Sequence, residues 1–435
     1  MPKGDERPRI GLDGYNLALP SGTGVATYGR NLAAVVRDLG HPLDLLFGLN
    51  IPRKVRPDLR ETLFFGRLGE PAPQRMTWRR AVRRATVLPF AHDMIEVPIG
   101  GKVVAREVQE RLPSFDRLFN LSEIFEICAR HFRRYGRFMT LRMKSPPAIM
   151  HWTYPLPIRL AGARNIYTLH DLVPLRLPFA SLEDKRYYDD LVRACISEAA
   201  HIVTVSETSR NDILSVMDVD PARVTNTGQS SAMPEIRDPG ALPDRLARLF
   251  DLPYQRYLLF FGAIEPKKNV GRLIQAYLEA DVETPLILVG PEAWQADREL
   301  RLLKNAHGIS LPAAQRIRRI EYLPRAMLAD VVRGARAVLF PSLYEGFGLP
   351  VLEAMSAGVP IVASSTGSLP EVVGDAGLLV DPYDIDALVA GIRQIDRDDA
   401  LRARLALEGL RQAERFSFDR FRTAMNLVYQ SVLSP

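Results

Sequence analysis

The sequence predicts an α/β protein with two open domains whose parallel sheets face each other across a cleft, and three observations lead to this class. Short apolar runs typical of buried strands alternate with segments whose apolar residues recur at helical spacing. Several of these runs end in a glycine turn that leads into a helix, as in EGFGLPVLEAMSAG at 345–358. The alternation is interrupted at 234–253, where four prolines stand among scattered charges, and then starts again.

The first unit begins with a predicted strand at 9–12. A helix follows at 25–39, because its apolar residues recur at helical spacing and Gly40 ends the pattern, and the next strand falls at 43–49. This strand–helix–strand order indicates a parallel sheet. The other elements expected in this unit are strands at 148–152, 166–169 and 201–205, and helices around Arg80, at 117–135 and at about 183–199.

The second unit repeats the alternation from Tyr257 onward. Its expected strands are 258–261, 286–289, 337–340 and 361–363, and its expected helices lie near 270–280, 325–335, 385–395 and 400–414. We interpret 234–253 as the linker, with domain limits at 1–235 and 236–415. Because ligands of open α/β sheets bind at the carboxyl ends of the strands, the loops that follow the strands should carry the chemistry.

The composition is that of an ordinary globular protein, with 47% hydrophobic and 25% charged residues in 435. Neither a membrane-spanning apolar run nor a segment of signal-peptide type is evident. The two cysteines, Cys128 and Cys195, lie in apparent helices and form neither a disulfide framework nor a metal-ligand pattern. We interpret both as small buried hydrophobes in a protein of the reducing cytoplasm.

The positive charge is unevenly distributed. Residues 51–150 hold 20 Lys and Arg against 10 Asp and Glu, although the whole chain carries only +6. Such a region suits an anionic acceptor or the acidic lipids of the inner membrane face, and it also suits solvated arginine-rich helices. We find no motif for nucleic acid. The basic pairs and clusters are Arg79–Arg80, Arg83–Arg84, Arg130, Arg133–Arg134 and Arg137.

The stretch at 345–358 places two glutamates in a glycine turn that leads into a helix. Gly346 and Gly348 permit a backbone that a side chain would block, so free N–H groups can point at a ligand above the preceding strand. Such N–H groups favour anions, whereas Glu345 and Glu353 would bind hydroxyls. A sugar nucleotide has both parts, a diphosphate and ribose and sugar hydroxyls. A structural turn with two solvated glutamates is the alternative.

Other predicted strand ends carry similar signals. Lys267 and Lys268 stand just before a helix and suit a diphosphate, although two such lysines are also a common exposed pair. A glycine turn before a helix can likewise be a purely structural loop. Glycines follow three further strands: Gly22 and Gly24, Gly262, and Gly290.

His170 and Asp171 follow the strand at 166–169. His170 is either a satisfied core histidine or a hydrogen-bond donor to a substrate oxygen, with Asp171 orienting its ring. Ser206 follows the strand at 201–205 and could simply cap the next helix. A pair of acid and base carboxylates at Glu345 and Glu353 would suit a hydrolase, but their place beside glycines and basic residues favours binding over proton transfer.

Two segments resemble the retaining glycosyltransferase family four. FPSLYEGFGLPVLEAMSAGVPIVASSTGSLPEVVGDAGLLVDP at 340–382 is similar to the family signature, in which seven residues separate two glutamates, and GAIEPKKN at 262–269 is similar to a second family segment. The resemblance is strongest at 255–415, thinner at 9–50 and 148–230, and absent at 51–147. It implies the GT-B fold, in which two Rossmann-like domains face a cleft and a last helix, here 416–435, crosses back to the first domain.

The resemblance also implies roles for individual residues. Glu353 would hold the ribose of the nucleotide. The three catalytic residues would be Glu345 near the donor sugar, Lys268 on the diphosphate and His170 at the reacting sugar. Many relatives have arginine where this chain has Lys267. The lysine keeps the positive charge, but it cannot form the two parallel hydrogen bonds that a guanidinium makes to a phosphate. The other donor-binding residues that the resemblance implies are Gly22, Gly24, Gly262, Gly290, Gly346, Phe347, Gly348 and Leu349.

The function that follows from the resemblance is the transfer of a sugar from a nucleotide-diphosphate donor to an acceptor hydroxyl, with retention at the anomeric carbon. GDP-mannose is the expected donor, because GAIEPKKN and the His-Asp pair resemble mannosyltransferase segments. The expected acceptor is a saccharide or a lipid-linked saccharide, and neither a metal ion nor another cofactor is expected. A sugar-nucleotide epimerase or hydrolase and a non-catalytic nucleotide-sugar-binding protein stay open. A dehydrogenase is disfavoured, since SGTGVATYG lacks the last glycine of the dinucleotide fingerprint.

Overall fold

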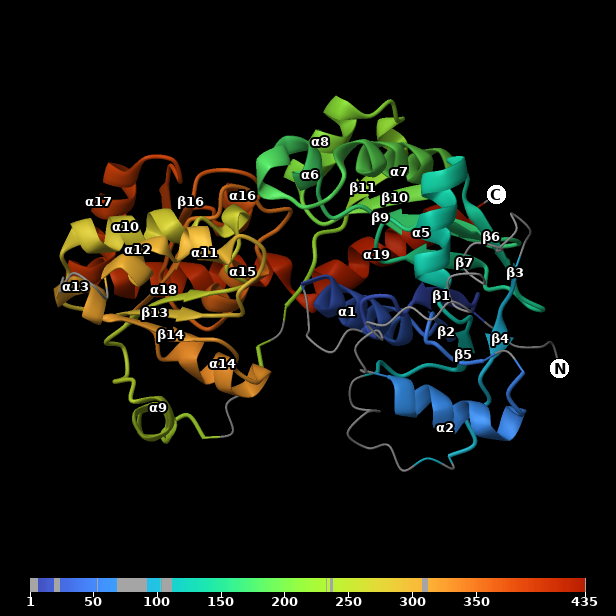
Figure 1. Ribbon diagram of the computed structural model, residues 1–435, viewed down its shortest axis with the longest axis horizontal. Coiled ribbons are helices and arrows are strands. Elements are labelled where there is room, and N and C mark those ends of the chain that lie inside the picture. Colours follow the sequence, from blue (N-terminus) through green and yellow to red (C-terminus); the bar gives the residue numbers. More distant parts are fainter. Residues whose placement is uncertain are drawn as a thin grey trace.

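The computed structural model describes residues 7–18, 24–52, 54–68, 92–101, 103, 112–231, 233–234, 238–306 and 312–434. Its described part contains two large sheets, one in each half of the molecule, and a small third sheet (Figure 1). Nearly all strand pairs are parallel, as the alternation of strands and helices predicts. The predicted α/β class with parallel sheets in two parts is thereby confirmed.

The first sheet has eight strands in the order β11-β10-β9-β7-β1-β2-β5-β4, and only β4 runs antiparallel to its neighbour. Its strands are β1 (Ile10–Asp13), β2 (Leu43–Phe47), β4 (Ile95–Glu96), β5 (Arg117–Asn120), β7 (Ile149–Trp152), β9 (Arg164–Thr168), β10 (His201–Thr204) and β11 (Val224–Asn226). The accompanying helices are α1 (Gly24–Asp38), α2 (Pro57–Arg67), α5 (Ile124–Tyr135), α6 (Val173–Arg176), α7 (Lys185–Glu198) and α8 (Glu207–Val216). The small sheet pairs β3 (His92–Asp93), β6 (Met139–Arg142) and β8 (Ile158–Leu160).

The second sheet has six parallel strands in the order β14-β13-β12-β15-β16-β17. Its strands are β12 (Leu258–Phe261), β13 (Leu286–Val289), β14 (Ile317–Ile320), β15 (Ala337–Phe340), β16 (Ile361–Ser364) and β17 (Leu378–Val380). Its helices are α9 (Leu242–Phe250), α10 (Val270–Ala280), α11 (Ala296–Glu299), α12 (Arg301–Ala306), α13 (Pro312–Gln315), α14 (Arg325–Arg333), α15 (Leu349–Ser356), α16 (Leu369–Val373), α17 (Ile385–Arg397), α18 (Asp399–Ala413) and α19 (Phe418–Leu433).

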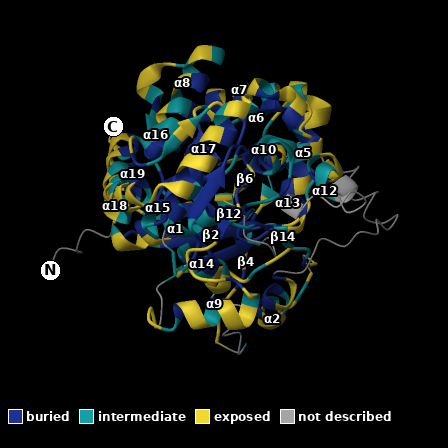
Figure 2. Ribbon diagram, turned by 90° about the vertical axis from the view of Figure 1, so that its left-hand side faces the viewer, coloured by how far each residue is buried: buried dark blue, intermediate teal, exposed yellow. Residues whose placement is uncertain are grey.

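The central strands are buried on both faces because helices cover both sides of each sheet. The four residues of β12, for example, are all buried, which explains why the strand reads as an unbroken apolar run rather than an alternating one. Figure 2 shows the strands dark blue inside the molecule and the helices with yellow outer faces.

The last helix, α19, returns to the first sheet. The hydroxyl of Tyr429 in α19 forms a hydrogen bond of 3.0 Å with Nδ1 of the buried His151 in β7. Arg422 of α19 forms an ion pair of 2.6 Å with Asp38 of α1. Figure 1 shows the red helix α19 beside α1. Such contacts are expected of a last helix that crosses back to the first domain. The domain limits at 1–235, 236–415 and 416–435 stay a prediction.

The structure corrects two expected elements. The predicted helix at 117–135 is strand β5 followed by α5, which begins only at Ile124. The predicted linker at 234–253 contains helix α9, and Arg245 of α9 holds it to Asp330 of α14 at 3.1 Å. The expected helix around Arg80 lies outside the described residues. Among the described helices, none has the length and apolar character needed to cross a membrane.

Candidate active site

The carboxyl ends of the two sheets meet between the halves of the molecule. Ser206, which follows β10, donates a hydrogen bond to the carbonyl of Gly346 at 2.6 Å. Ser209 lies one turn further along α8 and donates to the carbonyl of His170 at 2.7 Å. A Cβ on Gly346 would lie 2.5 Å from that same carbonyl, so only glycine allows this approach. Ser206 also accepts from Ser209 N, which confirms it as the cap of α8.

Glu345 and two lysines form a buried ionic cluster at this junction. The ammonium of Lys268 lies 2.6 Å from Oε1 of Glu345, and that of Lys267 lies 3.7 Å from Oε2. Glu345 is only 7% exposed. Burial alone would raise the pKa of Glu345, but the two ammonium groups outweigh it and the pKa is lowered. Burial would likewise lower the pKa of Lys267, but Glu345 and Asp171 hold it above its usual value.

Hydrogen bonds hold the end of the segment 262–269 against residues 341–343, which lead into the segment 345–353. Leu343 donates its N–H to the carbonyl of Lys267 at 2.8 Å. Asn269, whose φ is 60°, donates its amide to the carbonyls of Pro341 at 3.0 Å and Pro382 at 2.8 Å. The two segments that the sequence singled out therefore form one structural unit, with Lys268 and Glu345 at its centre.

Helix α15 begins at this cluster. Gly348 is its N-cap, with a φ of 101° and no capping side chain, and Phe347 is buried against Phe416 with ring centroids 5.4 Å apart. In the first turn of α15, Pro350 has no N–H, and the N–H groups of Val351 and Leu352 donate to the carbonyl of Gly348 at 3.0 and 3.2 Å. The N–H of Leu349 is the donor of this turn that has no partner inside the helix. Gly24, the first residue of α1, lies alongside, since a Cβ there would be 3.5 Å from Leu349.

His170 is tied down at one ring nitrogen. Its Nε2 lies 2.9 Å from the carbonyl of Thr153, which can only accept, so Nε2 carries the proton. Burial lowers the pKa of His170 and keeps the ring neutral. Nδ1 is then an acceptor, which corrects the expectation that His170 donates to substrate. Oδ1 of Asp171 accepts from Val173 N at 3.0 Å, and its role in orienting the ring stays a prediction.

The geometry agrees with the comparisons to known proteins. A profile described as "Glycosyl transferases group 1" matches residues 252–411. The O-antigen chain mannosyltransferase B of Escherichia coli is 38% identical over 271 residues, which cover 61% of this chain and 69% of that one. The chain belongs to the glycosyl transferases group 1 family. It is thus a glycosyltransferase, an enzyme that takes a nucleotide-sugar donor and a saccharide acceptor.

Other relatives of this glycosyltransferase agree on the family. The serotype-specific mannosyltransferase WbdA of Escherichia coli is 29% identical over 329 residues, 69% of this chain but only 40% of that one. Sucrose-phosphate synthase from Thermosynechococcus elongatus matches with a TM-score of 0.66 at 19% identity, over 98% of this chain and 99% of that one. HepE from Anabaena, solved with UDP and glucose, also matches with a TM-score of 0.66 at 13% identity, over 98% of this chain and 100% of that one. These structures confirm the GT-B fold that the sequence resemblance predicts.

Glu353, the second signature glutamate of the glycosyltransferase, lies on α15 and reaches toward the segment that leaves the first sheet. Its Oε1 accepts from the hydroxyl of Ser231 at 2.9 Å. Burial raises its pKa, although Ser231 and the cation of Arg325 oppose the rise. A carboxyl in this position can accept hydroxyl groups, as a ribose would offer them.

Asp13, which the sequence reading missed, supports the site from behind. It ends β1, is 1% exposed and accepts from Tyr15 N at 3.1 Å and from Thr153 at both N and Oγ1. Burial outweighs these hydrogen bonds and raises the pKa of Asp13 to about 6. Because Thr153 also holds His170, Asp13 positions that ring through Thr153. The feature of the sequence that could have pointed to Asp13 is a charged residue at the end of an apolar strand, directly before a glycine.

Of the remaining predicted site residues, Gly262 and Gly290 have a structural role, and Gly22 lies outside the part of the chain that the structure describes. Gly290 has a φ of 150°, and a Cβ there would lie 1.9 Å from the carbonyl of Gly262, so these two glycines let adjoining strand ends touch. Gly22 lies outside the described residues. Within the described part of the chain, no group of three His, Cys, Asp or Glu could hold a metal ion. Three Asp-x-Asp triplets, 218–220, 384–386 and 396–398, lie at helix ends.

Proposed function

We propose that this glycosyltransferase moves a mannosyl residue from GDP-mannose to a hydroxyl of a saccharide acceptor, with retention at the anomeric carbon. The observation that carries the proposal is the pair of largely buried lysines beside Glu345, near the start of α15. Two ammonium groups and a helix N-terminus match the charge of a diphosphate. The choice of mannose rests on the mannosyltransferase names of the relatives.

In the proposed reaction, the bond between the anomeric carbon and the β-phosphate oxygen breaks, and negative charge grows on that oxygen. Lys267, Lys268 and the N–H of Leu349 would stabilise this charge, and because they are fixed in advance they favour the transition state over the ground state. Glu345 keeps both lysines in place, and its Oε2, which lies 3.7 Å from the ammonium of Lys267, also accepts from a sugar hydroxyl. Glu353 receives the ribose.

Retention requires attack on the same face that the leaving group departs from, or a covalent intermediate. The carboxylates nearest the junction are already engaged, Glu345 by lysines and Asp171 by Val173 N. We therefore favour same-face attack. The acceptor oxygen bonds to the anomeric carbon, and its proton passes to the departing phosphate oxygen, which balances the step. Neutral His170 accepts a hydrogen bond from the donor sugar at Nδ1.

We further propose that the reaction needs no metal ion, because the lysine cations supply the positive charge at the leaving group. Turnover in EDTA equal to that in Mg²⁺ or Mn²⁺ is the expected result. Activity that EDTA abolishes and added Mn²⁺ restores would contradict this part of the proposal.

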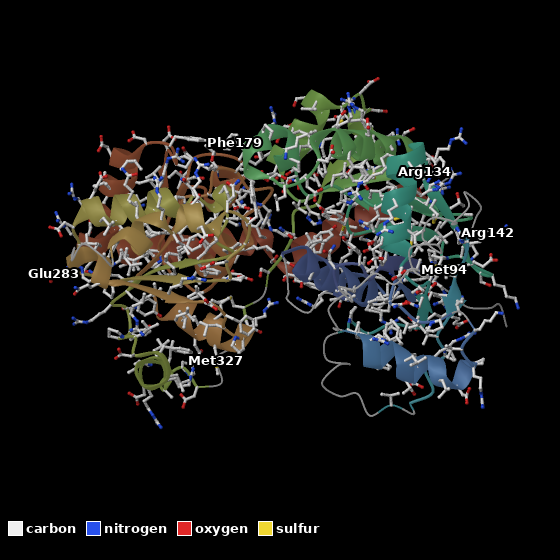
Figure 3. The ribbon with its side chains drawn as sticks, in the orientation of Figure 1. Met94, Arg134, Arg142, Phe179, Glu283 and Met327 are labelled. Carbon is white, nitrogen blue, oxygen red and sulfur yellow. The ribbon has the colours of Figure 1, made fainter. Side chains whose placement is uncertain are left out.

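For the acceptor we propose a lipid-linked saccharide at the inner face of the membrane, as in O-antigen assembly. One relative is named for the O-antigen chain. The exposed face of α5 is basic, with Arg130, Arg133 and Arg134 all exposed and Arg137 just beyond the helix. Figure 3 shows Arg134 on the outer side of α5, away from the second sheet. Arginines on one helix face attract anionic headgroups.

A panel of UDP, GDP, dTDP and ADP sugars tests the donor. We expect GDP-mannose to raise the melting temperature most, since a ligand that binds only the folded state stabilises it. Radiolabelled GDP-mannose with an isolated saccharide-lipid acceptor then tests transfer, and the anomeric configuration of the product tests retention. Free mannose without acceptor would indicate a hydrolase, an epimerised sugar an epimerase, and donor binding without any product a binding protein.

A further inference from the structure

A row of aromatic rings runs away from His170 along the carboxyl edge of the first sheet. His170, Tyr154 and Tyr15 follow β9, β7 and β1, which are neighbours in the sheet. The ring centroids of His170 and Tyr154 lie 6.5 Å apart, and those of Tyr154 and Tyr15 lie 6.0 Å apart. Phe125 of α5 supports the far end, edge-on to Tyr15 at 5.1 Å.

The two tyrosines differ from the core tyrosines of the protein. Both are partly exposed, and their phenol oxygens have no hydrogen-bond partner among the described residues. A buried phenol normally finds a partner. The core tyrosines do so: Tyr28, Tyr167, Tyr188, Tyr257, Tyr277 and Tyr429 all bond through their hydroxyls. The hydroxyls of Tyr15 and Tyr154 are therefore left to bond with solvent or a ligand.

Acidic side chains border the row. Burial raises the pKa values of Tyr15 and Tyr154, and the nearby charge of Glu183 adds to the rise at both. Glu126 acts in the same way on Tyr15. Both glutamates are exposed. Two half-buried rings with unpaired hydroxyls and carboxylates at the rim offer apolar faces together with donors and acceptors, which is the surface that a sugar ring and its hydroxyls require.

We propose that Tyr15 and Tyr154 form the platform on which the acceptor saccharide stacks, with its reactive hydroxyl directed toward His170. This inference rests on the proposed function, since a donor at the Lys268–Glu345 cluster needs an acceptor from the opposite side of the junction. The row begins at the residue assigned to the reacting sugar and leads outward on the half of the molecule that does not hold the lysines. The acceptor's terminal ring lies over Tyr154, and the next ring lies over Tyr15.

Saturation-transfer NMR with methyl α-D-mannopyranoside in the presence of GDP tests the platform without turnover. We expect the sugar's C–H protons to receive saturation in the unaltered protein, and the signal to fall about tenfold in Tyr154→Leu, which keeps apolar volume but loses the ring face. Tyr154→Phe should keep most of the signal. In transfer assays, Tyr15→Ala and Tyr154→Ala should raise the acceptor KM about tenfold and leave the GDP Kd unchanged.

Tyr322→Ala is the matched control, because Tyr322 is 73% exposed and lies in the other half of the molecule. An unchanged GDP Kd shows that each variant is folded and that its donor site is intact. Unchanged saturation transfer and acceptor KM in Tyr15→Ala and Tyr154→Leu would overturn the platform while leaving the donor proposal standing. A protein that does not bind GDP at all would instead overturn the proposed function and the platform with it.

Discussion

The ammonium of Lys268 lies 2.6 Å from Oε1 of Glu345, and both side chains are nearly buried, with 13% and 9% of their surfaces exposed. Lys267 faces the same carboxylate. Lys267 also lies 4.0 Å from Glu265, so two carboxylates balance the two lysines beside the start of α15. A diphosphate arriving there meets cations that are already desolvated and fixed, so it does not have to order them.

Replacing Glu345 with Gln separates binding from catalysis. The variant keeps the shape but removes the carboxylate that Lys268 and Lys267 share, and only Lys267 keeps a second one, Glu265, so we expect the free protein to lose about 3 kcal/mol of stability. GDP should bind at least as tightly as before, because its diphosphate no longer competes with Glu345. Turnover should fall about 100-fold or more. Calorimetry and steady-state kinetics measure the two effects, and weaker GDP binding in Glu345→Gln would contradict this assignment.

Asp13 should make stability fall as pH rises through the weakly acidic range. Its pKa is about 6 in the folded protein against 3.8 in the unfolded chain, so the folded state binds more protons between these values. The stabilising effect is fully present below pH 3.8 and is lost as pH rises through 6, a total of roughly 3 kcal/mol.

Urea unfolding of the unaltered protein and of Asp13→Asn at pH 4.5, 6 and 7.5 measures this dependence. Asn does not titrate, so the difference in unfolding free energy between the two proteins should change by most of that amount across the range. A difference that stays constant with pH would show that Asp13 keeps an ordinary pKa.

Glu371 should hold the two halves together. It lies on α16 of the second half, and its carboxylate accepts from the N–H groups of Glu207 at 2.9 Å and Thr208 at 3.2 Å, at the start of α8. A carboxylate at a helix N-terminus contributes about 1 kcal/mol. Glu371→Gln should therefore favour an open molecule and raise the donor KM about fivefold.

Small-angle X-ray scattering measures the opening directly. The radius of gyration of Glu371→Gln should exceed that of the unaltered protein without ligand and approach it when GDP is added. Glu408→Gln, which removes a partly exposed partner of Arg404 on α18, is the control and should change neither quantity. Equal radii for Glu371→Gln and the unaltered protein would argue against a closing role.

The basic face of α5 should bind anionic vesicles. Arg130 and Arg134 are exposed there, and each contributes about 1 kcal/mol near a charged surface. In the double variant Arg130→Ala, Arg134→Ala, the partition coefficient of the protein to vesicles that contain phosphatidylglycerol should fall roughly tenfold or more. Arg404→Ala with Arg411→Ala, on α18, should leave it unchanged. Equal partitioning of all three proteins in a sedimentation assay would remove the membrane proposal.

Local patterns predicted the part of the fold that depends on local physics. Unbroken apolar runs such as 258–261 and 337–340 became buried strands, and the turn at 345–358 became a glycine cap followed by α15. Strand β14 was missed because its sequence, IRRI, reads as polar. Its arginines pair with groups distant in sequence, Arg318 with Asp251 and Arg319 with Glu292. Such pairings cannot be read from a single segment.

The candidate site was foreseen by residue type but not by partner. Lys268 and Glu345 were both singled out, yet the sequence does not reveal that they meet, because 77 residues separate them. Asp13 was missed for the same reason, since its partner Thr153 is 140 positions away. The role of His170 changed from donor to acceptor because of a backbone carbonyl, a group that leaves no signal in the sequence.

The affinity gap between GDP and guanosine, measured by calorimetry in the unaltered protein and in Lys268→Ala, tests the diphosphate site most directly. The two ligands share the base and ribose and differ in the diphosphate alone. We predict that the unaltered protein binds GDP about 100-fold more tightly than guanosine, and that Lys268→Ala loses at least tenfold of this gap while its guanosine affinity stays the same. A gap of equal size in both proteins would show that the diphosphate binds elsewhere.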